Sequence, residues 1–169
     1  AKEDFGDWMG PLAAAGWWVL APDLRGHGAS PKPEEESAYS IRHFVDDLLA
    51  LVDGAGWSTF SLLGHSMGGM VAQELAMSAP ERVERLVLMD THHAALGVVD
   101  RPTAEVGAGI VRAHGIARLA DMLEGLGERA PADLRVSAAR PGYDEWNRAK
   151  LEACSPAMYA ALLVEMSGR

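Results

Sequence analysis

Cysteine is almost absent from this sequence, since Cys154 stands alone among 169 residues. One cysteine cannot form an intramolecular disulfide, which excludes the disulfide-stabilised folds of small secreted proteins. No run reaches the roughly 18 consecutive apolar residues that a membrane-spanning helix needs. We therefore expect a cytoplasmic protein that has no membrane partner.

Basic residues are also scarce, with 15 Lys and Arg against 24 Asp and Glu and a formal net charge of -9. A chain without a basic stripe is a poor candidate for nucleic-acid binding. Its length and 49% hydrophobic content suit one core with a smaller appended layer. The sequence gives no indication of an oligomeric state.

Both ends lack the usual signals of a complete chain. The first residue is not methionine, and no charged segment followed by an apolar one marks a signal peptide. We expect the sequence to be the interior section of a longer protein.

The first third of the chain alternates helix, strand and helix patterns. Apolar residues at helical spacing predict a helix over residues 5–15, and the short apolar run 17–23 predicts a buried strand. Residues 24–37 are rich in glycine, proline and serine and are expected to form a loop. The clearest predicted helix follows, with Ser40 as its N-cap and Gly54 near its end.

Further along, apolar runs at 60–63 and 83–89 predict two strands on either side of a helix over 70–79. Strands alternating with helices indicate an α/β fold, a parallel sheet with right-handed crossovers. Residues 91–169 are alanine- and leucine-rich stretches broken by glycine and proline, without a convincing strand. We therefore predict an α/β core over residues 1–90 and a mostly helical cap over 91–169.

The stretch LLGHSMGGM places Ser66 between an apolar strand and a small-residue helix. In a G-x-S-x-G pattern the serine occupies a strained turn that exposes its hydroxyl, and the flanking glycines allow close backbone approach. We expect a positive φ at Ser66 and a helix beginning at Met67, whose N–H is aimed at an oxyanion. The alternative is a tight helix start with Ser66 as an ordinary cap.

The segment LLGHSMGGMVAQELAMSAPERVERLVLMD, together with GWWVLAPDLRGHGAS upstream, resembles the α/β-hydrolase superfamily. The resemblance is to its branch of small esterases, lactonases and carbon-carbon bond hydrolases. It implies that Ser66 is the catalytic nucleophile and that the Met67 N–H forms half of the oxyanion hole. It also implies that Arg25 and His27 pack rather than react.

The resemblance further implies that three parts of the catalytic machinery lie outside these residues: the second oxyanion donor, the acid and the histidine. Of the histidines after Ser66, none follows a late strand as the family requires; they are His92, His93 and His114. We expect none of them to take the serine proton, so the chain as given is expected to be essentially inert while a longer parent is active.

Several other polar residues invite a functional interpretation. His65 and His92 are predicted to border the pocket, although a packed imidazole is an equal alternative for His65. His92 and His93 have no third ligand at a sensible spacing, so neither a metal nor an organic cofactor is expected. Asp90, at a strand end, is expected to bond local backbone rather than serve as the triad acid.

These observations predict hydrolysis of a small-molecule acyl substrate, an ester or a lactone, through an acyl-Ser66 intermediate. The alternatives are a carbon-carbon bond hydrolase and a non-catalytic ligand sensor with the same fold. A dehalogenase is disfavoured because its nucleophile is a carboxylate. Specificity is expected to come from cap side chains that line the pocket: Tyr143, Trp146 and Met158.

Overall fold

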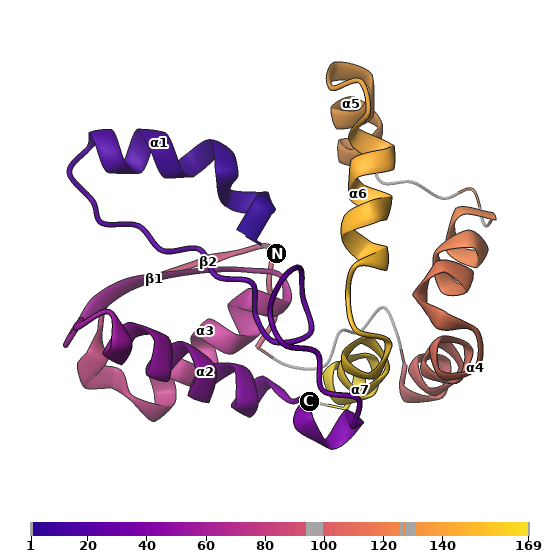
Figure 1. Cartoon of the computed structure of the whole chain (residues 1–169), viewed down its shortest axis with the longest axis horizontal. Helices are drawn as coiled ribbons and strands as arrows, with labels where there is room; N and C mark the ends of the chain where they lie inside the picture. Colours follow the sequence, from indigo (N-terminus) through magenta and orange to yellow (C-terminus); the bar gives the residue numbers. More distant parts are fainter. Residues whose placement is uncertain (1, 94–99, 126, 128–130, 169) are drawn as a thin grey trace.

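The computed structural model describes residues 2–93, 100–125, 127 and 131–168. The elements follow the order η1 (Lys2–Phe5), α1 (Gly6–Ala14), η2 (Glu36–Ala38), α2 (Ile41–Gly54), β1 (Phe60–His65), α3 (Met67–Ser78), η3 (Pro80–Arg82), β2 (Val83–Met89), α4 (Arg101–Gly125), α5 (Pro131–Ala139), α6 (Tyr143–Glu152) and α7 (Pro156–Ser167). In these residues α1, α2 and α3 flank a two-stranded parallel sheet, and α4 to α7 are grouped to one side of it (Figure 1).

The two predicted strands of the sheet are confirmed. β1 pairs in parallel with β2, in a register that ends with His65 opposite Met89. α3 connects them as a crossover helix and packs on both strands and on α2. Parallel strands end at the same edge of a sheet, so the residues after β1 and β2, Ser66 and Asp90, are neighbours.

The strand predicted over residues 17–23 is wrong for the described structure. These residues run without helix or strand pairing, and Trp18 is 85% exposed. An extended segment becomes a strand only when a neighbouring strand accepts its backbone hydrogen bonds. Here β1 pairs with β2 alone, and an apolar cavity lies between β1 and residues 19–22.

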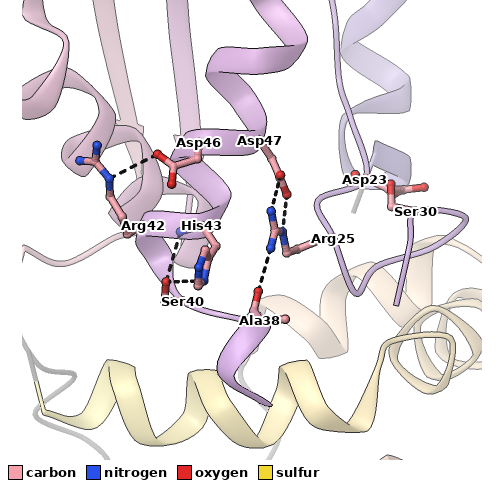
Figure 2. Close-up of polar contacts among 9 residues, drawn as sticks. All are labelled: Asp23, Arg25, Ser30, Ala38, Ser40, Arg42, His43, Asp46 and Asp47. Carbon is pink, nitrogen blue, oxygen red and sulfur yellow. Dashed lines mark hydrogen bonds and ion pairs between the residues drawn. The ribbon is translucent and has the colours of Figure 1, made fainter. Parts of the chain in front are cut away.

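Helix α2 supplies much of the core. Its predicted N-cap is confirmed, because the Ser40 hydroxyl accepts a hydrogen bond from the His43 N–H at 3.1 Å (Figure 2). The apolar face of α2 is buried at Ile41, Phe44 and Val45. This face packs in one cluster with α3, which contributes Val71 and Leu75 among others.

Beyond residue 100, every described regular element is a helix, as predicted (Figure 1). Gly115, with φ 80° and ψ 173°, divides α4 into two helical pieces, whereas the helix continues through Gly107. α4 packs mainly on α7. No helix in the described ranges has both the length and the apolar character needed to cross a bilayer.

α7 joins the later helices to the core of the first half. Met158 and Leu162 are buried in the same cluster as Ile41 and Phe44. The Ile41 N–H also donates to a Glu165 carboxylate oxygen at 3.0 Å. The core therefore extends across residue 90, and the boundary between core and cap remains a prediction.

A second tie is electrostatic. Arg112 of α4 makes two hydrogen bonds to the Glu36 carboxylate in η2, at 2.6 and 2.9 Å. The guanidinium holds the pKa of Glu36 below its ordinary value, although partial burial opposes the shift. This pair fixes α4 against the turn that precedes α2.

Candidate functional site

Ser66 occupies a strained turn between β1 and α3. Its backbone has φ 52° and ψ -124°, a conformation that residues other than glycine rarely adopt. Its N–H donates to the Met89 carbonyl at 3.0 Å, and its carbonyl accepts from the N–H groups of Gly69 and Met70 at 2.9 and 3.3 Å. The predicted positive φ and the helix beginning at Met67 are confirmed.

The glycines around Ser66 differ in what they permit. A Cβ at Gly64 would lie 2.3 Å from the Gly68 carbonyl oxygen, so the first turn of α3 closes directly onto the end of β1. A Cβ at Gly68 would meet nothing within 4 Å. The prediction that both glycines of the motif permit close approach is therefore right for Gly64 and wrong for Gly68. Gly69, which lies outside the motif, is crowded by Thr91.

The first turn of α3 presents unused donors beside the Ser66 hydroxyl. Ser66 makes no side-chain cap hydrogen bond. Within the described part of the chain, no hydrogen bond joins an acceptor to the N–H of Met67 or Gly68. These N–H groups and the positive end of the helix dipole favour negative charge close to Ser66.

An apolar cavity of about 370 Å³ lies next to the turn. Ser66, Met67 and His65 border it, and its other walls come mainly from α1, residues 19–24, α2, β1 and α3. Its lining includes Trp8, Met9, Leu12, Leu62, Val71 and Leu75. Every lining residue precedes residue 76.

The side chains predicted to line the pocket from the cap do not reach this cavity. Tyr143 and Trp146 stack on each other with ring centroids 5.6 Å apart, and the Lys150 ammonium lies 4.6 Å from the Trp146 ring. Met158 is buried in the core with Tyr39 and Ile41. That prediction is wrong because these residues pair within the helical layer or serve the core.

The polar residues near the ends of β1 and β2 lie on the surface. His65 borders the cavity, and its Nε2 lies 4.0 Å from the Asp90 carboxylate. Asp90 has φ 41° and an almost fully exposed side chain, and no backbone group of the described residues bonds its carboxylate, contrary to expectation. His92 is exposed outside the cavity lining, and its carbonyl accepts from Gln73.

No imidazole of the described residues hydrogen-bonds the Ser66 hydroxyl. His27 borders the cavity, but its ring packs edge-on against Phe44 with centroids 6.2 Å apart. Burial lowers the pKa of His27, so its imidazole is neutral at pH 7. His27 therefore packs, as the family resemblance implies.

Arg25 has a structural position as well. Its guanidinium makes two hydrogen bonds to the Asp47 carboxylate, at 2.5 and 2.6 Å, and donates to the Ala38 carbonyl at 2.9 Å (Figure 2). These bonds join the loop after residue 23 to α2 and raise the pKa of Arg25. Arg25 thus supports the loop that carries His27.

The described residues contain no candidate metal site, because no three His, Cys, Asp or Glu side chains converge among them. Cys154 is partly buried, and burial raises the pKa of its thiol. A protonated thiol is a poor nucleophile.

Comparison with known proteins identifies the family of this chain. A family model described as the alpha/beta hydrolase fold matches residues 3–109, which include the turn, its two strands and the start of α4. The chain belongs to the α/β-hydrolase fold family. The fold class predicted from the sequence is thereby confirmed.

Individual relatives extend the likeness. Epoxide hydrolase 2 of Siraitia grosvenorii is 36% identical over 100 residues, covering 57% of this chain and 32% of the relative. A hydrolase from Pseudomonas aeruginosa PA01 superposes with a TM-score of 0.75 at 32% identity, covering 95% of this chain and 58% of that one. The enol-lactonase from Burkholderia xenovorans LB400 superposes with a TM-score of 0.71 at 26% sequence identity, covering 86% of this chain and 52% of the lactonase. The chain thus spans little more than half of each solved structure.

Proposed function

We propose that Ser66 is the nucleophile of a hydrolase for small esters or lactones, and that it works through an acyl-enzyme intermediate. The observation that carries the proposal is the left-handed backbone of Ser66. That strained turn exposes the hydroxyl beside an apolar cavity and at the head of a helix with unused N–H groups.

The geometry supports acyl transfer step by step. The Ser66 oxygen attacks the substrate carbonyl carbon, and the negative charge that forms on the carbonyl oxygen is stabilised by the Met67 N–H. One such donor is worth about 3 to 4 kcal/mol in the transition state. The intermediate collapses as the alcohol leaves with the proton taken from Ser66. Water later attacks the acyl-Ser66 carbonyl, and its proton passes to the serine oxygen as the acid is released.

Both attacks need a base to accept a proton from the attacking oxygen. The described residues place no imidazole in hydrogen-bond contact with Ser66. We therefore propose that this chain acylates slowly and turns over hardly at all, and that a base supplied by further polypeptide would complete the site.

Names among the relatives include epoxide hydrolases as well as a lactonase. A serine nucleophile favours an ester or lactone substrate over an epoxide. Attack of a serine oxygen on an epoxide carbon would form an ether, which water does not readily cleave, whereas attack on an ester or lactone forms an ester that water can hydrolyse. The side chains around the cavity beside Ser66 are mostly apolar, which suits an apolar acyl group.

A fluorophosphonate probe tests the proposal because it phosphonylates a serine oxygen in a single step, so even slow attack by Ser66 accumulates as labelled protein without turnover. We expect peptide mapping to find the phosphonyl group on Ser66 and to find none in Ser66→Ala. Ser78→Ala is the matched control, because Ser78 ends the same helix and its hydroxyl donates to the Leu75 carbonyl, away from the turn. Labelling spread over several serines, or none at Ser66, would reject the nucleophile.

A ligand sensor is the second candidate, and the absence of a bonded imidazole among the described residues favours it. A sensor would leave Ser66 unlabelled while small esters or lactones still raised the melting temperature of the chain.

A further inference from the structure

Thr91 lies two residues beyond β2, where its hydroxyl reaches across to the turn. Its Oγ1 donates a 2.7 Å hydrogen bond to the Ser66 carbonyl oxygen. The other hydrogen bonds of the Ser66 backbone within the described ranges come from main-chain groups: the Met89 carbonyl and the N–H groups of Gly69 and Met70. Thr91 therefore adds a side-chain hydrogen bond to this turn from the segment that follows β2.

The position of Thr91 is fixed from two sides. A Cβ on Gly69 would lie 2.5 Å from both Cβ and Oγ1 of Thr91, so the threonine packs onto the bare backbone of the first turn of α3. One turn later, Gln73 donates to the carbonyls of Gly69 and His92, at 3.2 and 3.0 Å. Thr91 and the residue after it, His92, are thus both held to α3.

The bonded carbonyl belongs to the same peptide group as the Met67 N–H. A trans peptide is planar, and its C=O and N–H point in opposite directions. Fixing the Ser66 oxygen therefore fixes the direction of the Met67 N–H. A hydrogen bond accepted by the carbonyl also polarises the N–H at the other end of the group.

We propose that Thr91 is a positioning residue, whose hydroxyl orients the Ser66–Met67 peptide so that the Met67 N–H faces the oxyanion. This inference deepens the proposed function and rests on it. Thr91 is not among the residues that line the cavity, and its hydroxyl bonds the Ser66 carbonyl oxygen, so it acts through the peptide plane. Nothing in the sequence pattern marks it, since it lies 25 residues from Ser66.

Thr91→Val removes the hydroxyl and keeps the branched shape, and Thr91→Ser keeps the hydroxyl. In the 169-residue chain, we expect Thr91→Val to slow the maximal rate of Ser66 labelling by a fluorophosphonate about 3- to 10-fold, the effect of one hydrogen bond. The probe concentration at half-maximal rate should not change. Thr91→Ser should restore the rate.

Thr59→Val is the matched control, because the Thr59 hydroxyl also spans the two strands, bonding Glu84 at 2.7 Å, but at their opposite end. It should label like the wild type. An unchanged maximal rate in Thr91→Val, or a loss that Thr91→Ser does not restore, would overturn the positioning role.

Hydrogen exchange separates this inference from the proposed function. In Thr91→Val, the Ser66 carbonyl loses the hydroxyl that anchors its peptide to the chain after β2, so the turn opens more often. We therefore expect the amides of Gly69 and Met70, which bond the same carbonyl, to exchange several-fold faster, with recovery in Thr91→Ser. If the wild type is not labelled, the nucleophile proposal fails, and unchanged exchange in Thr91→Val would then overturn the Thr91 hydrogen bond itself.

Discussion

At the scale of single residues, Gly64 and Gly68 can be told apart by substitution. A methyl group at Gly64 would lie 2.3 Å from the Gly68 carbonyl oxygen, a backbone atom that cannot turn aside. We expect Gly64→Ala to lower the free energy of unfolding by about 1 to 3 kcal/mol, the usual cost of overpacking. Urea unfolding followed by circular dichroism measures the change.

Gly68→Ala is the matched control, since its methyl group would meet nothing within 4 Å and alanine favours a helix. Its stability should equal or exceed that of the wild type. Equal losses in both variants would show that the first turn of α3 does not close on β1 as described.

The motif around Ser66 could be predicted from the sequence because its constraints are local. A strand, a left-handed serine and a helix start follow one another within nine residues. The contribution of Thr91 could not be predicted, because it depends on β2 ending beside Ser66 in one register. The cavity could not be predicted either, since it lies between α1, residues 19–24 and β1.

Among the elements, those with their own caps or periodicity were predictable. α2 has an N-cap serine and an apolar face, so its limits are encoded within its own residues. Residues 17–23 have an apolar composition but depend on a pairing partner that composition does not reveal. The Gly115 break in α4 was indicated by glycine, yet Gly107 did not break the same helix.

The docking of α7 against the core can be tested by comparing substitutions of two methionines, one buried and one exposed. Met158 is 2% exposed in the core, whereas Met77 of α3 is 73% exposed. We expect Met158→Ala to cost about 2 to 5 kcal/mol of unfolding free energy, because it leaves a cavity against Tyr39 and Ile41. Urea unfolding provides the measurement.

Met77→Ala should change that free energy by less than about 0.5 kcal/mol. A Met158→Ala variant as stable as Met77→Ala would mean that α7 does not share the core of α2.

At the scale of the whole molecule, the ion pair between Glu36 of η2 and Arg112 of α4 makes the docking of α4 sensitive to acid. Because the folded-state pKa of Glu36 is below its ordinary 4.5, the pair stabilises the fold fully above that pH. The stabilisation is lost as the pH falls through the folded-state pKa. We expect the melting temperature to fall less steeply with acid in Glu36→Gln than in the wild type.

Asp46→Asn is the control for this pH series, because the Arg42–Asp46 pair lies within α2 (Figure 2) and both of its side chains are more than half exposed. Its melting curve should follow that of the wild type between pH 7 and pH 3. A Glu36→Gln profile parallel to the wild type would show that this pair contributes nothing to the docking of α4.

The central claim for the molecule as a whole is that the strained turn makes Ser66 an acyl acceptor. The most direct test is reaction of the chain with p-nitrophenyl acetate, followed by intact-mass measurement and peptide mapping. The account predicts slow release of about one equivalent of p-nitrophenolate, little further turnover, and an acetyl group on Ser66 that Ser66→Ala lacks. Acetylation distributed over lysines and other serines, with Ser66 unmodified, would contradict it.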